Sequence, residues 1–420
     1  MSRVWDVPVP DTTRVRDVLV ATEAACARAG LDARRTAAAV QVATELATNA
    51  LQHAGGGHTV IHLVAPPDAE PRTDEAWVQI ASLDHGPGIG DVRAALRDGF
   101  TTRPASRGAG LGECLRQANA FDLYGRPDRG TVAVARVGPL PAVRVGPREA
   151  APPPAESTGS RPAVGVGPTP AEGTGPRPAV GAGQPPADGT GPRPAVSTGP
   201  PPAEGTGTPP VARQAVPPGR HTRERVGGLN VPLGLAEHSG DAFTWVRSGT
   251  RLTMMLADGL GHGPKAAHAS TTAVAQLRRT AGLPPDEILR GLHTALRPTR
   301  GAAVAVGQLD ESTGLFTFCG VGNVGARLRV GDSWQSLLSH PGIVGAHFPA
   351  RLPVRRTPWQ SDSLFLLHSD GLPGRWTPPT DPRLFAHDPA VIAASVVRDA
   401  RGAGRPLRDD TSVAVLVPER

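Results

Sequence analysis

The sequence predicts two α+β domains joined by a linker, and three observations lead to that prediction. The chain has 420 residues, which leaves room for two or three domains of ordinary size. It contains 51 glycines and 46 prolines, and these concentrate between about Gly138 and Gly219. On either side of that segment, apolar residues recur at helical spacing or in short strand-like runs, and 39% of the chain is hydrophobic, enough for a core in each part.

The first domain, expected over residues 1–137, begins with helices and continues with strands. Asp11 and Thr12 can cap a first helix that ends at Gly30, and Asp32 can start a second helix that ends at the glycines of 55–57. The remaining elements are expected as strands over 58–64 and 77–83, a helix from 91, a glycine-rich loop, a helix over 114–120 and a strand over 132–137. Two helices ahead of antiparallel-looking strands predict an α/β sandwich.

Several motifs of this first domain together indicate a nucleotide site. Glu45 and Asn49 lie four residues apart on the second helix, so they share one face with Cβ atoms roughly 6 Å apart. Such a pair also occurs by chance on solvated helices. The order of the later motifs favours a site: Asp84 with Gly86 and Gly88 comes after a strand, and a glycine-rich turn then opens a helix and can cradle phosphates. The turn and the closing motif consist of Gly108, Gly110, Gly112, Gly130 and Thr131.

The phrases ATELATNALQHAGGG, DHGPGIGD and GAGLGEC resemble the Bergerat-fold ATPases, the superfamily of gyrase, histidine kinases and anti-sigma-factor serine kinases, over residues 14–137. They are most similar to the anti-sigma and stressosome switch kinases. The resemblance implies that Asn49 coordinates Mg²⁺, that Glu45 is the catalytic group polarising the attacking hydroxyl, and that Asp84 binds the adenine of ATP. It places Gly86, Gly88, Gly108, Gly110, Gly112 and Thr131 around the nucleotide. No phospho-accepting histidine hairpin precedes Glu45, which disfavours a histidine kinase.

The second domain, expected over residues 221–420, is richer in short strands. Many strands with few helices predict two packed sheets flanked by helices. Strands are expected over 252–257, 302–308, 315–319, 326–330, 363–368 and 412–417, and helices over 264–280, 286–296 and 389–398.

Aspartates in this second domain follow apolar strands at several places. Carboxylates suit hard Mg²⁺ or Mn²⁺, and no Cys or His group offers a softer site. Because Asp-Gly is also a common turn dipeptide, each aspartate alone is more simply read as a turn residue. Their recurrence after strands favours a shared metal centre formed by Asp241, Asp258, Asp370 and Asp409–Asp410.

The phrases MMLADGLGHG, TRGAAVAVGQLD, CGVGNVGARL, LFLLHSDGL and RDDTSVAVLV resemble the PPM-type metal-dependent protein phosphatases, in particular the SpoIIE-like branch, over residues 224–417. The resemblance implies an α-β-β-α sandwich holding two Mn²⁺ or Mg²⁺ ions. Asp258 would bridge the metals, with Asp241, the Gly259 carbonyl, Asp370 and Asp409 as further ligands. Asp410 is more doubtful as a ligand, and His262 fits a supporting role. The phosphate-clamping arginine of eukaryotic members has no identifiable counterpart.

The segment over 138–220 contains a 16-residue unit that recurs at 159–174, 175–190 and 191–206. Each unit offers little beyond one Ala-Val pair to bury, so a stacked solenoid is disfavoured. A disordered, partly polyproline spacer is the simplest interpretation, with a proline-rich ligand role as the alternative.

Charge and cysteine content exclude several classes of protein. The net charge is +6, but nearly all positive residues are arginines scattered among acidic residues, without the basic patch and aromatic residues of a nucleic-acid binder. The three cysteines form no CxxC pair, which disfavours a disulfide framework and a zinc site and suits a reducing cytoplasm. There is no apolar run of 18 residues, so no membrane span is expected.

Together the two resemblances imply a bacterial regulator of protein phosphorylation in sigma-factor or stress signalling. The second domain would dephosphorylate serine or threonine, and the first would phosphorylate a STAS-type anti-sigma antagonist or sequester a sigma factor. The alternative is a phosphatase whose first domain is a non-catalytic, ATP-dependent regulatory module. A scaffold with two inactive sites is a third possibility. The client, the stress signal and the oligomeric state are not encoded in any motif.

Overall fold

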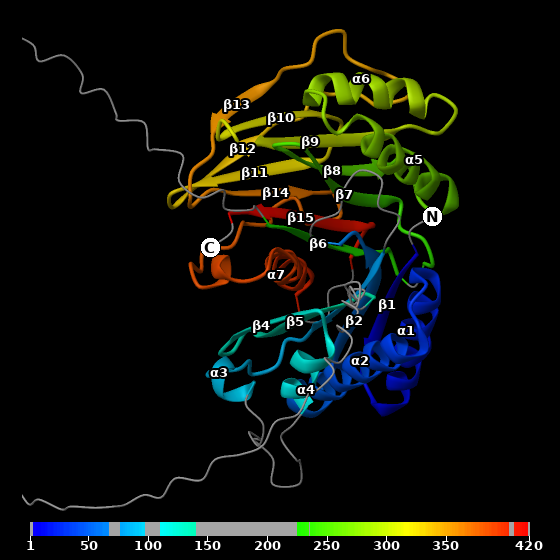
Figure 1. Ribbon diagram of the computed structural model, residues 1–420, viewed down its shortest axis with the longest axis vertical. Coiled ribbons are helices and arrows are strands. Elements are labelled where there is room, and N and C mark those ends of the chain that lie inside the picture. Colours follow the sequence, from blue (N-terminus) through cyan, green and yellow to red (C-terminus); the bar gives the residue numbers. More distant parts are fainter. Residues whose placement is uncertain are drawn as a thin grey trace, which may run out of the picture. The chain divides into compact units, whose positions relative to one another are not determined.

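The computed structural model describes residues 3–66, 76–96, 110–139, 225–234, 236–402 and 407–418. The predicted linker lies outside these ranges except for its first two residues, and Gly108 lies outside them as well. The segments before and after residues 142–217 form one compact unit. Within it each segment builds an α+β domain of antiparallel sheets, as the sequence predicts (Figure 1).

The first domain is one five-stranded sheet with helices on one face. The strand order is β1-β2-β3-β5-β4, and every neighbouring pair is antiparallel. The strands are β1 (Val4–Val9), β2 (Gly57–Val64), β3 (Trp77–Leu83), β4 (Ala120–Arg126) and β5 (Gly130–Val137). The helices are α1 (Val15–Ala29), α2 (Ala33–Ala54), α3 (Val92–Ala95) and α4 (Gly110–Gln117).

The caps that the sequence predicts for the first two helices are confirmed. The Asp11 carboxylate accepts from Thr13 N at a short 3₁₀ turn that leads into α1, and Gly30 ends that helix in the left-handed conformation. Asp32 accepts from Arg35 N at the start of α2, and Gly55 ends α2 in the same way. The apolar faces of α1 and α2 then pack on one face of the sheet around Val42, Ile61 and Ile80.

Two strands of this sheet are not expected from the sequence. β1 contains Pro8, which argues against a strand, but β1 is an edge strand that pairs only with β2 and therefore tolerates a missing donor. β4 begins at Ala120, where the sequence predicts the end of a helix; α4 in fact stops at Gln117.

The second domain contains two five-stranded antiparallel sheets. Their orders are β13-β10-β9-β8-β7 and β12-β11-β14-β15-β6. The strands are β6 (Arg225–Val231), β7 (Asp241–Ser248), β8 (Arg251–Gly259), β9 (Ala302–Asp310), β10 (Leu315–Val321), β11 (Gly325–Val330), β12 (Ser333–Leu337), β13 (Arg355–Pro358), β14 (Leu364–His368) and β15 (Thr411–Val417). Four of them, β6, β7, β12 and β13, lie outside the runs that the sequence predicts.

The helices of the second domain cover the outer faces of its sheets, which confirms the α-β-β-α arrangement. α5 (Pro264–Thr280) and α6 (Pro285–Leu296) pack on the sheet that contains β8 and β9. α7 (Pro389–Arg401) packs on β6 and β15 of the other sheet. Between the sheets lies an apolar layer that includes Met254, Phe316 and Phe365.

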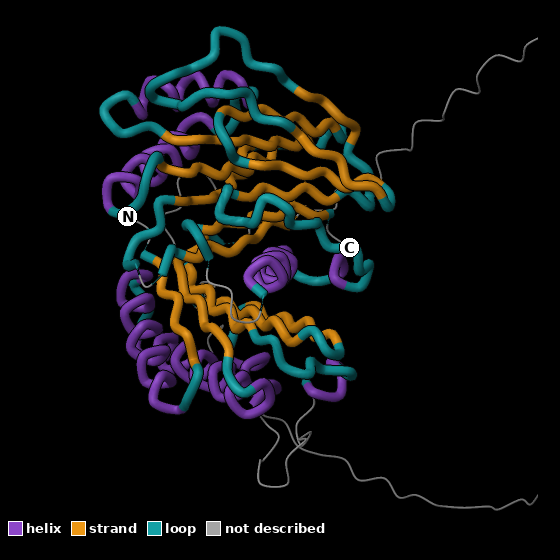
Figure 2. The backbone as a smooth tube through the Cα atoms, turned by 180° about the vertical axis from the view of Figure 1, so that it is seen from behind, coloured by secondary structure: helices purple, strands orange, loops and turns teal. Residues whose placement is uncertain are grey.

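Helix α7 also touches the first domain. One apolar cluster joins α7 residues such as Val391 and Val397 to Val60, Leu83 and Val134 on the sheet face of the first domain that α1 and α2 leave uncovered. Figures 1 and 2 both show α7 between the strands β4 and β5 on one side and β6 and β15 on the other.

No helix in the described part of the chain combines the length and apolar character needed to cross a membrane.

Arg35 on α2 fastens the helices of the first domain to the end of its sheet. Its side chain is 6% exposed and donates to the carbonyl oxygens of Gly138 (2.8 Å) and Gln117 (3.1 Å) and to Asn119 Oδ1. The guanidinium thus satisfies a carbonyl at the last turn of α4 and the chain just beyond β5.

We expect Arg35→Ala to lower the free energy of unfolding by roughly 3 kcal/mol, because it leaves the carbonyl oxygens of Gly138 and Gln117 without this donor and removes one of the two donors to Asn119 Oδ1. Urea unfolding followed by circular dichroism measures this. Arg34→Ala is the matched control: Arg34 is exposed, and its replacement should change stability by less than about 0.5 kcal/mol. Equal effects of the two variants would contradict the role assigned to Arg35.

Candidate functional site

A pocket of about 380 Å³ opens in the first domain between α2, the end of β3 and the start of α4. Its volume lies within the range of small-molecule sites. Of the residues that the sequence places at the nucleotide, six line this pocket: Glu45, Asn49, Asp84, Gly88, Gly110 and Thr131. Gly86 and Gly112 do not line it, and Gly108 is outside the described residues.

The wall formed by α2 is one helical face. Glu45, Asn49 and His53 recur at spacings of four, with Leu46 and Ala50 beside them. Asn49 Nδ2 donates to Glu45 Oε1 at 3.2 Å. The side-chain oxygen Oδ1 of Asn49 is therefore the atom of this amide that could bind a cation. The sequence motif contains only two residues of this face; extending the same periodicity would have found His53, Leu46 and Ala50.

Asp84 lies just beyond the last residue of β3 and is 8% exposed. Its Oδ1 accepts two backbone amides, from Gly86 (2.9 Å) and Thr131 (3.0 Å). Burial raises the pKa of Asp84 above its usual 3.8, and these two hydrogen bonds partly oppose the rise. With Oδ1 held by backbone donors, Oδ2 is the atom that can accept a hydrogen bond from a ligand.

Two glycines of the pocket lie in close contact with neighbouring groups. Gly88 has φ of 75°, and a β-carbon there would collide with the carbonyl oxygen of Arg126. Gly110, the first residue of α4, lies so close to the Glu45 carboxylate that a β-carbon would overlap it. The N-terminus of α4 therefore opens directly beside Glu45.

The apolar part of this pocket is not recognisable from the sequence. It includes Ile89, Ala95, Leu111, Leu123 and Ala133, which come from loops, α3, α4 and two strands. These residue types are equally typical of a core, so only the three-dimensional structure reveals that they face a cavity.

The second domain brings its predicted carboxylates to neighbouring strand ends. Asp241, the first residue of β7, lies directly opposite Asp258 of β8 in the antiparallel register, so their side chains are close. Asp241 is 1% exposed, and its Oδ2 has no hydrogen-bond partner among the described residues. Burial and the Asp258 charge raise its pKa well above the usual value. Gly259, next to Asp258, donates its backbone N–H to the Gly240 carbonyl at 3.0 Å.

The other carboxylates act on Asp258 through their charge. Burial, followed by the charges of Asp370, Asp409 and Asp410, raises the pKa of Asp258 to about 7. Burial and the Asp409 charge also raise the pKa of Asp370. Asn323 Nδ2 donates to Asp370 Oδ2 at 2.6 Å; this asparagine is not among the predicted site residues, although it lies within the phrase CGVGNVGARL.

Asp410 is engaged differently from the other four aspartates. Its Oδ1 accepts from Leu233 N at 2.7 Å and its Oδ2 from Gly240 N at 2.6 Å. Both oxygens thus hold the loops that lead away from β6 and into β7. The geometry makes Asp410 a residue that shapes the site.

The donor chemistry of this cluster fits hard divalent cations. In the described residues, no group of three or more His, Cys, Asp or Glu side chains is assembled closely enough, as it stands, to hold a metal ion. The carboxylates nevertheless raise one another's pKa, and the buried Asp241 Oδ2 lacks a donor. Oxygen ligands, repulsion between negative charges and an unpaired buried oxygen are features that Mg²⁺ or Mn²⁺ would use or relieve.

Two basic side chains belong to the loops around the carboxylates. Arg300 Nη1 lies 2.9 Å from the position that a β-carbon of Gly261 would occupy, so this exposed guanidinium lies beside the loop that follows Asp258. His262, in the same loop, is also exposed, and its charge acts to lower the pKa of Asp410. Arg300 is not identifiable from the sequence, because its neighbour in space is 39 positions away along the chain.

Both domains match models of known protein families. Residues 248–417 match the family described as "Stage II sporulation protein E (SpoIIE)". Residues 9–133 match the "Histidine kinase-like ATPase domain".

Individual relatives match the second domain. The phosphoserine phosphatase RsbX of Bacillus subtilis (strain 168) is 27% identical over 135 residues, which are 32% of this chain and 67% of RsbX. A solved structure of RsbX in complex with magnesium is 22% identical, with a TM-score of 0.40, and the match covers 46% of this chain and 95% of RsbX. A structure from a study of the bacterial stressosome is 29% identical, with a TM-score of 0.41, covering 46% of this chain and 99% of the other.

If Asp84 makes the adenine contact that the sequence resemblance implies, the affinity for an adenine nucleotide should fall on acidification. An ionised Asp84 can accept a hydrogen bond from the adenine amino group, and a protonated one accepts it less well. Because burial raises the pKa of Asp84, affinity should be constant at neutral pH and decrease as the pH falls through that raised pKa, above 3.8. Titration with a fluorescent adenine nucleotide at several pH values measures this.

Asp84→Asn should weaken binding roughly 10- to 100-fold, the worth of a charged hydrogen bond, and remove the pH dependence. Asp128→Asn is the control, since Asp128 is exposed and has φ of 61°, a conformation that asparagine tolerates. A pH profile that is the same in wild type and Asp84→Asn would show that another group titrates.

Proposed function

The chain joins a histidine kinase-like ATPase domain to a SpoIIE-type protein phosphatase domain, and from this pairing we propose that it controls the phosphorylation of serine or threonine in a partner protein. In this proposal residues 1–137 form the ATP-binding domain, 138–220 the linker and 221–420 the phosphatase. One observation carries the proposal: the carboxylates at neighbouring strand ends of the second domain lie close together, beside Arg300. The first domain has a separate pocket, in which the buried Asp84 could accept a hydrogen bond from adenine.

The phosphatase reaction would take place at the carboxylate cluster. Asp241, Asp258, Asp370, Asp409 and the Gly259 carbonyl would hold two Mn²⁺ or Mg²⁺ ions. When bound, the cations would acidify water and offset negative charge on the phosphate. Asn323 holds the Asp370 carboxylate by its 2.6 Å hydrogen bond, and the cross-strand register keeps Asp241 opposite Asp258.

Arg300 is our candidate for binding phosphate oxygens of the substrate. It is exposed beside the loop after Asp258, and no hydrogen bond or ion pair links it to another described residue. A planar guanidinium can donate two parallel hydrogen bonds to a phosphate. Arg300 would then play the part of the phosphate-clamping arginine that could not be identified from the sequence.

The proposed substrate is a phosphoserine or phosphothreonine of a small regulatory protein. Support comes from RsbX, which is itself a phosphoserine phosphatase, and from the similarity of the first domain's motifs to anti-sigma kinases. A STAS-type anti-sigma antagonist in the cytoplasm is the client that suits both halves. A sigma factor is the second candidate partner of the first domain.

The first domain would bind ATP with Mg²⁺ and transfer its terminal phosphate to the client. Asp84 Oδ2 would accept a hydrogen bond from the adenine amino group, and the side-chain oxygen Oδ1 of Asn49 would bind the cation. Glu45 would take the proton of the attacking hydroxyl. Gly88, Gly110 and Thr131 would border the nucleotide, with Gly86, Gly108 and Gly112 supporting the loops. The N-terminus of α4 opens beside Glu45, so the phosphate-binding amides of that helix would lie close to this carboxylate.

A regulatory role without phosphotransfer is the second candidate for this domain. The observation that favours it is the set of direct hydrogen bonds between the two domains, among them His85 to Arg398 at 3.1 Å. In that case ATP would act as a ligand that alters the phosphatase.

We expect Asp258→Asn to lower Mn²⁺-dependent hydrolysis of an aryl phosphate by at least about 100-fold, because loss of this carboxylate removes several kcal/mol of charge stabilisation. A chelator should abolish wild-type activity, and added Mn²⁺ should restore it. Asp332→Asn makes the same change at a fully exposed aspartate and should leave the rate unchanged. Full activity of Asp258→Asn, or activity in the chelator, would refute the assigned site.

Glu45→Gln distinguishes the kinase from the regulatory module. It should be made in the Asp258→Asn chain, so that phosphate added to a STAS-type client is not removed. For a kinase, phosphotransfer measured by intact mass falls roughly 10²- to 10⁴-fold while nucleotide affinity is kept. Phosphotransfer that survives the change rules out Glu45 as the base, and absence of phosphotransfer with Glu45 present favours the regulatory module.

A further inference from the structure

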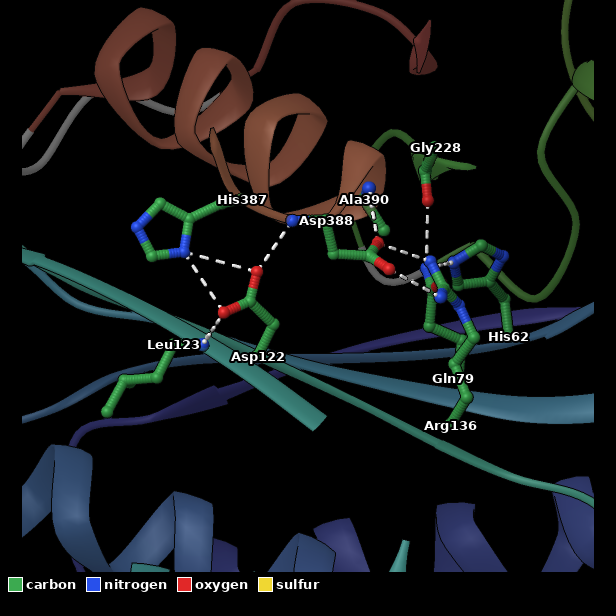
Figure 3. A network of polar contacts seen from close by, with 9 residues as sticks. All are labelled: His62, Gln79, Asp122, Leu123, Arg136, Gly228, His387, Asp388 and Ala390. Atoms are coloured by element: carbon green, nitrogen blue, oxygen red, sulfur yellow. Dashed lines mark hydrogen bonds and ion pairs between the residues drawn. The ribbon is translucent and has the colours of Figure 1, made fainter. Parts of the chain in front are cut away.

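Helix α7 of the phosphatase domain is joined to the sheet of the ATPase domain by an ion pair as well as by apolar packing. Arg136 of β5 donates to both oxygens of Asp388, at 2.9 and 2.6 Å, and the two side chains are 7% and 22% exposed (Figure 3). Asp388 is also the N-cap of α7 and accepts from Ala390 N. The same carboxylate thus starts the helix and fastens it to the other domain.

A second contact lies beside the first. Asp122 of β4 accepts from the backbone N–H of Asp388 at 2.6 Å and lies 3.0 Å from His387 Nδ1 (Figure 3). Two acidic groups and one arginine therefore hold the first turn of α7 in a single orientation on the sheet.

At its other end, α7 contacts the residue that follows Asp84. His85, the residue after Asp84, places Nε2 at 3.1 Å from the carbonyl oxygen of Arg398. Because the partner is a carbonyl, this nitrogen must carry the proton. Arg398 is 2% exposed, its Nη1 has no partner among the described residues, and its charge helps to lower the pKa of Asp84 against the dominant effect of burial. A ligand that changed the charge around Asp84 would therefore also change the electrostatic surroundings of Arg398.

Strand β6 connects the same sheet to the carboxylate cluster. Gln79 of β3 donates to the Gly228 carbonyl at 2.8 Å (Figure 3). Two residues further along β6, Asn230 donates to the backbone carbonyl of Asp241 at 2.9 Å. β3, which makes this contact to β6 through Gln79, ends at Leu83, immediately before the pocket residue Asp84.

The chain that follows α7 leads to the cluster as well. α7 packs on β6 and β15, and a β-carbon on Gly227 would lie only 2.7 Å from Ala390 N. Asp409 and Asp410 directly precede β15, and Asp410 binds Leu233 N just after β6. A shift of α7 would therefore displace both strands that position these carboxylates.

We propose that the adenine-nucleotide pocket and the phosphatase site are coupled through α7 and β6, so that nucleotide binding beside Asp84 changes phosphatase activity. This rests on the proposed function of the two domains and adds the physical route between them. His85 and Asp388 are positioning residues of this route: neither lines the pocket nor belongs to the carboxylate cluster.

The test uses the full-length chain and measures Mn²⁺-dependent aryl phosphate hydrolysis with and without saturating ADP or a non-hydrolysable ATP analogue. Wild type should show a nucleotide-dependent change of KM or kcat of roughly fivefold or more. His85→Ala should reduce that change to less than about twofold while nucleotide still binds. His85→Gln, which keeps an N–H donor for the Arg398 carbonyl, should restore it.

Asp388→Asn is the second variant, because asparagine keeps the helix cap but removes the charge that faces Arg136. It should also uncouple the sites, and hydrogen exchange over residues 389–398 should respond to nucleotide in wild type but not in this variant. Asp332→Asn, the same change at an exposed site, should retain wild-type coupling.

The outcomes separate this inference from the proposed function. Wild type that neither binds nucleotide nor hydrolyses aryl phosphate would overturn the proposed function and the coupling with it. Wild type that does both, but whose hydrolysis and hydrogen exchange ignore nucleotide, would overturn the coupling alone. Coupling that persists in His85→Ala and Asp388→Asn would overturn the route through α7.

Discussion

The burial of α7 on two sides is the constraint on which the arrangement of this chain depends. Every residue from Pro389 to Arg398 is buried, so the helix has no face for solvent, as its nearly uniform apolar sequence requires. One side packs on the outer face of the β6–β15 sheet, and the other packs on the sheet face of the first domain that α1 and α2 leave open. Each domain would otherwise present an apolar surface to water.

Both chemical sites use strand ends, but they handle charge in opposite ways. Asp84 accepts two backbone N–H groups, which offset part of the cost of its burial. The carboxylates of the second domain lie near one another, and burial followed by their mutual repulsion raises their pKa values. A carboxylate that already accepts backbone N–H groups suits a neutral ligand such as adenine, whereas a cluster with excess negative charge suits cations.

Much of the local structure could be predicted from the sequence, because caps and periodicity act over a few residues. Asp11, Gly30, Asp32 and Gly55 mark helix ends where expected, and the candidate aspartates do gather on neighbouring strand ends. Pro8 argues against a strand, so the edge strand β1 was not predicted. The nearly continuous burial of β5 shows that both of its faces are covered, but nothing local reveals that the second cover is a helix some 250 positions later. Arg300 could not be predicted either, because its neighbour in space is also distant along the chain.

The long sequence separation of this cover has a consequence for synthesis. The strands of the first sheet are complete at Val137, and the helix that covers their open face begins at Pro389. At roughly 5 to 20 residues per second, a ribosome would leave that face exposed for about 13 to 50 s. During this interval the nascent first domain offers an apolar surface to chaperones or to neighbouring chains, so the yield of the protein in the cell should depend on how quickly translation reaches the last helix.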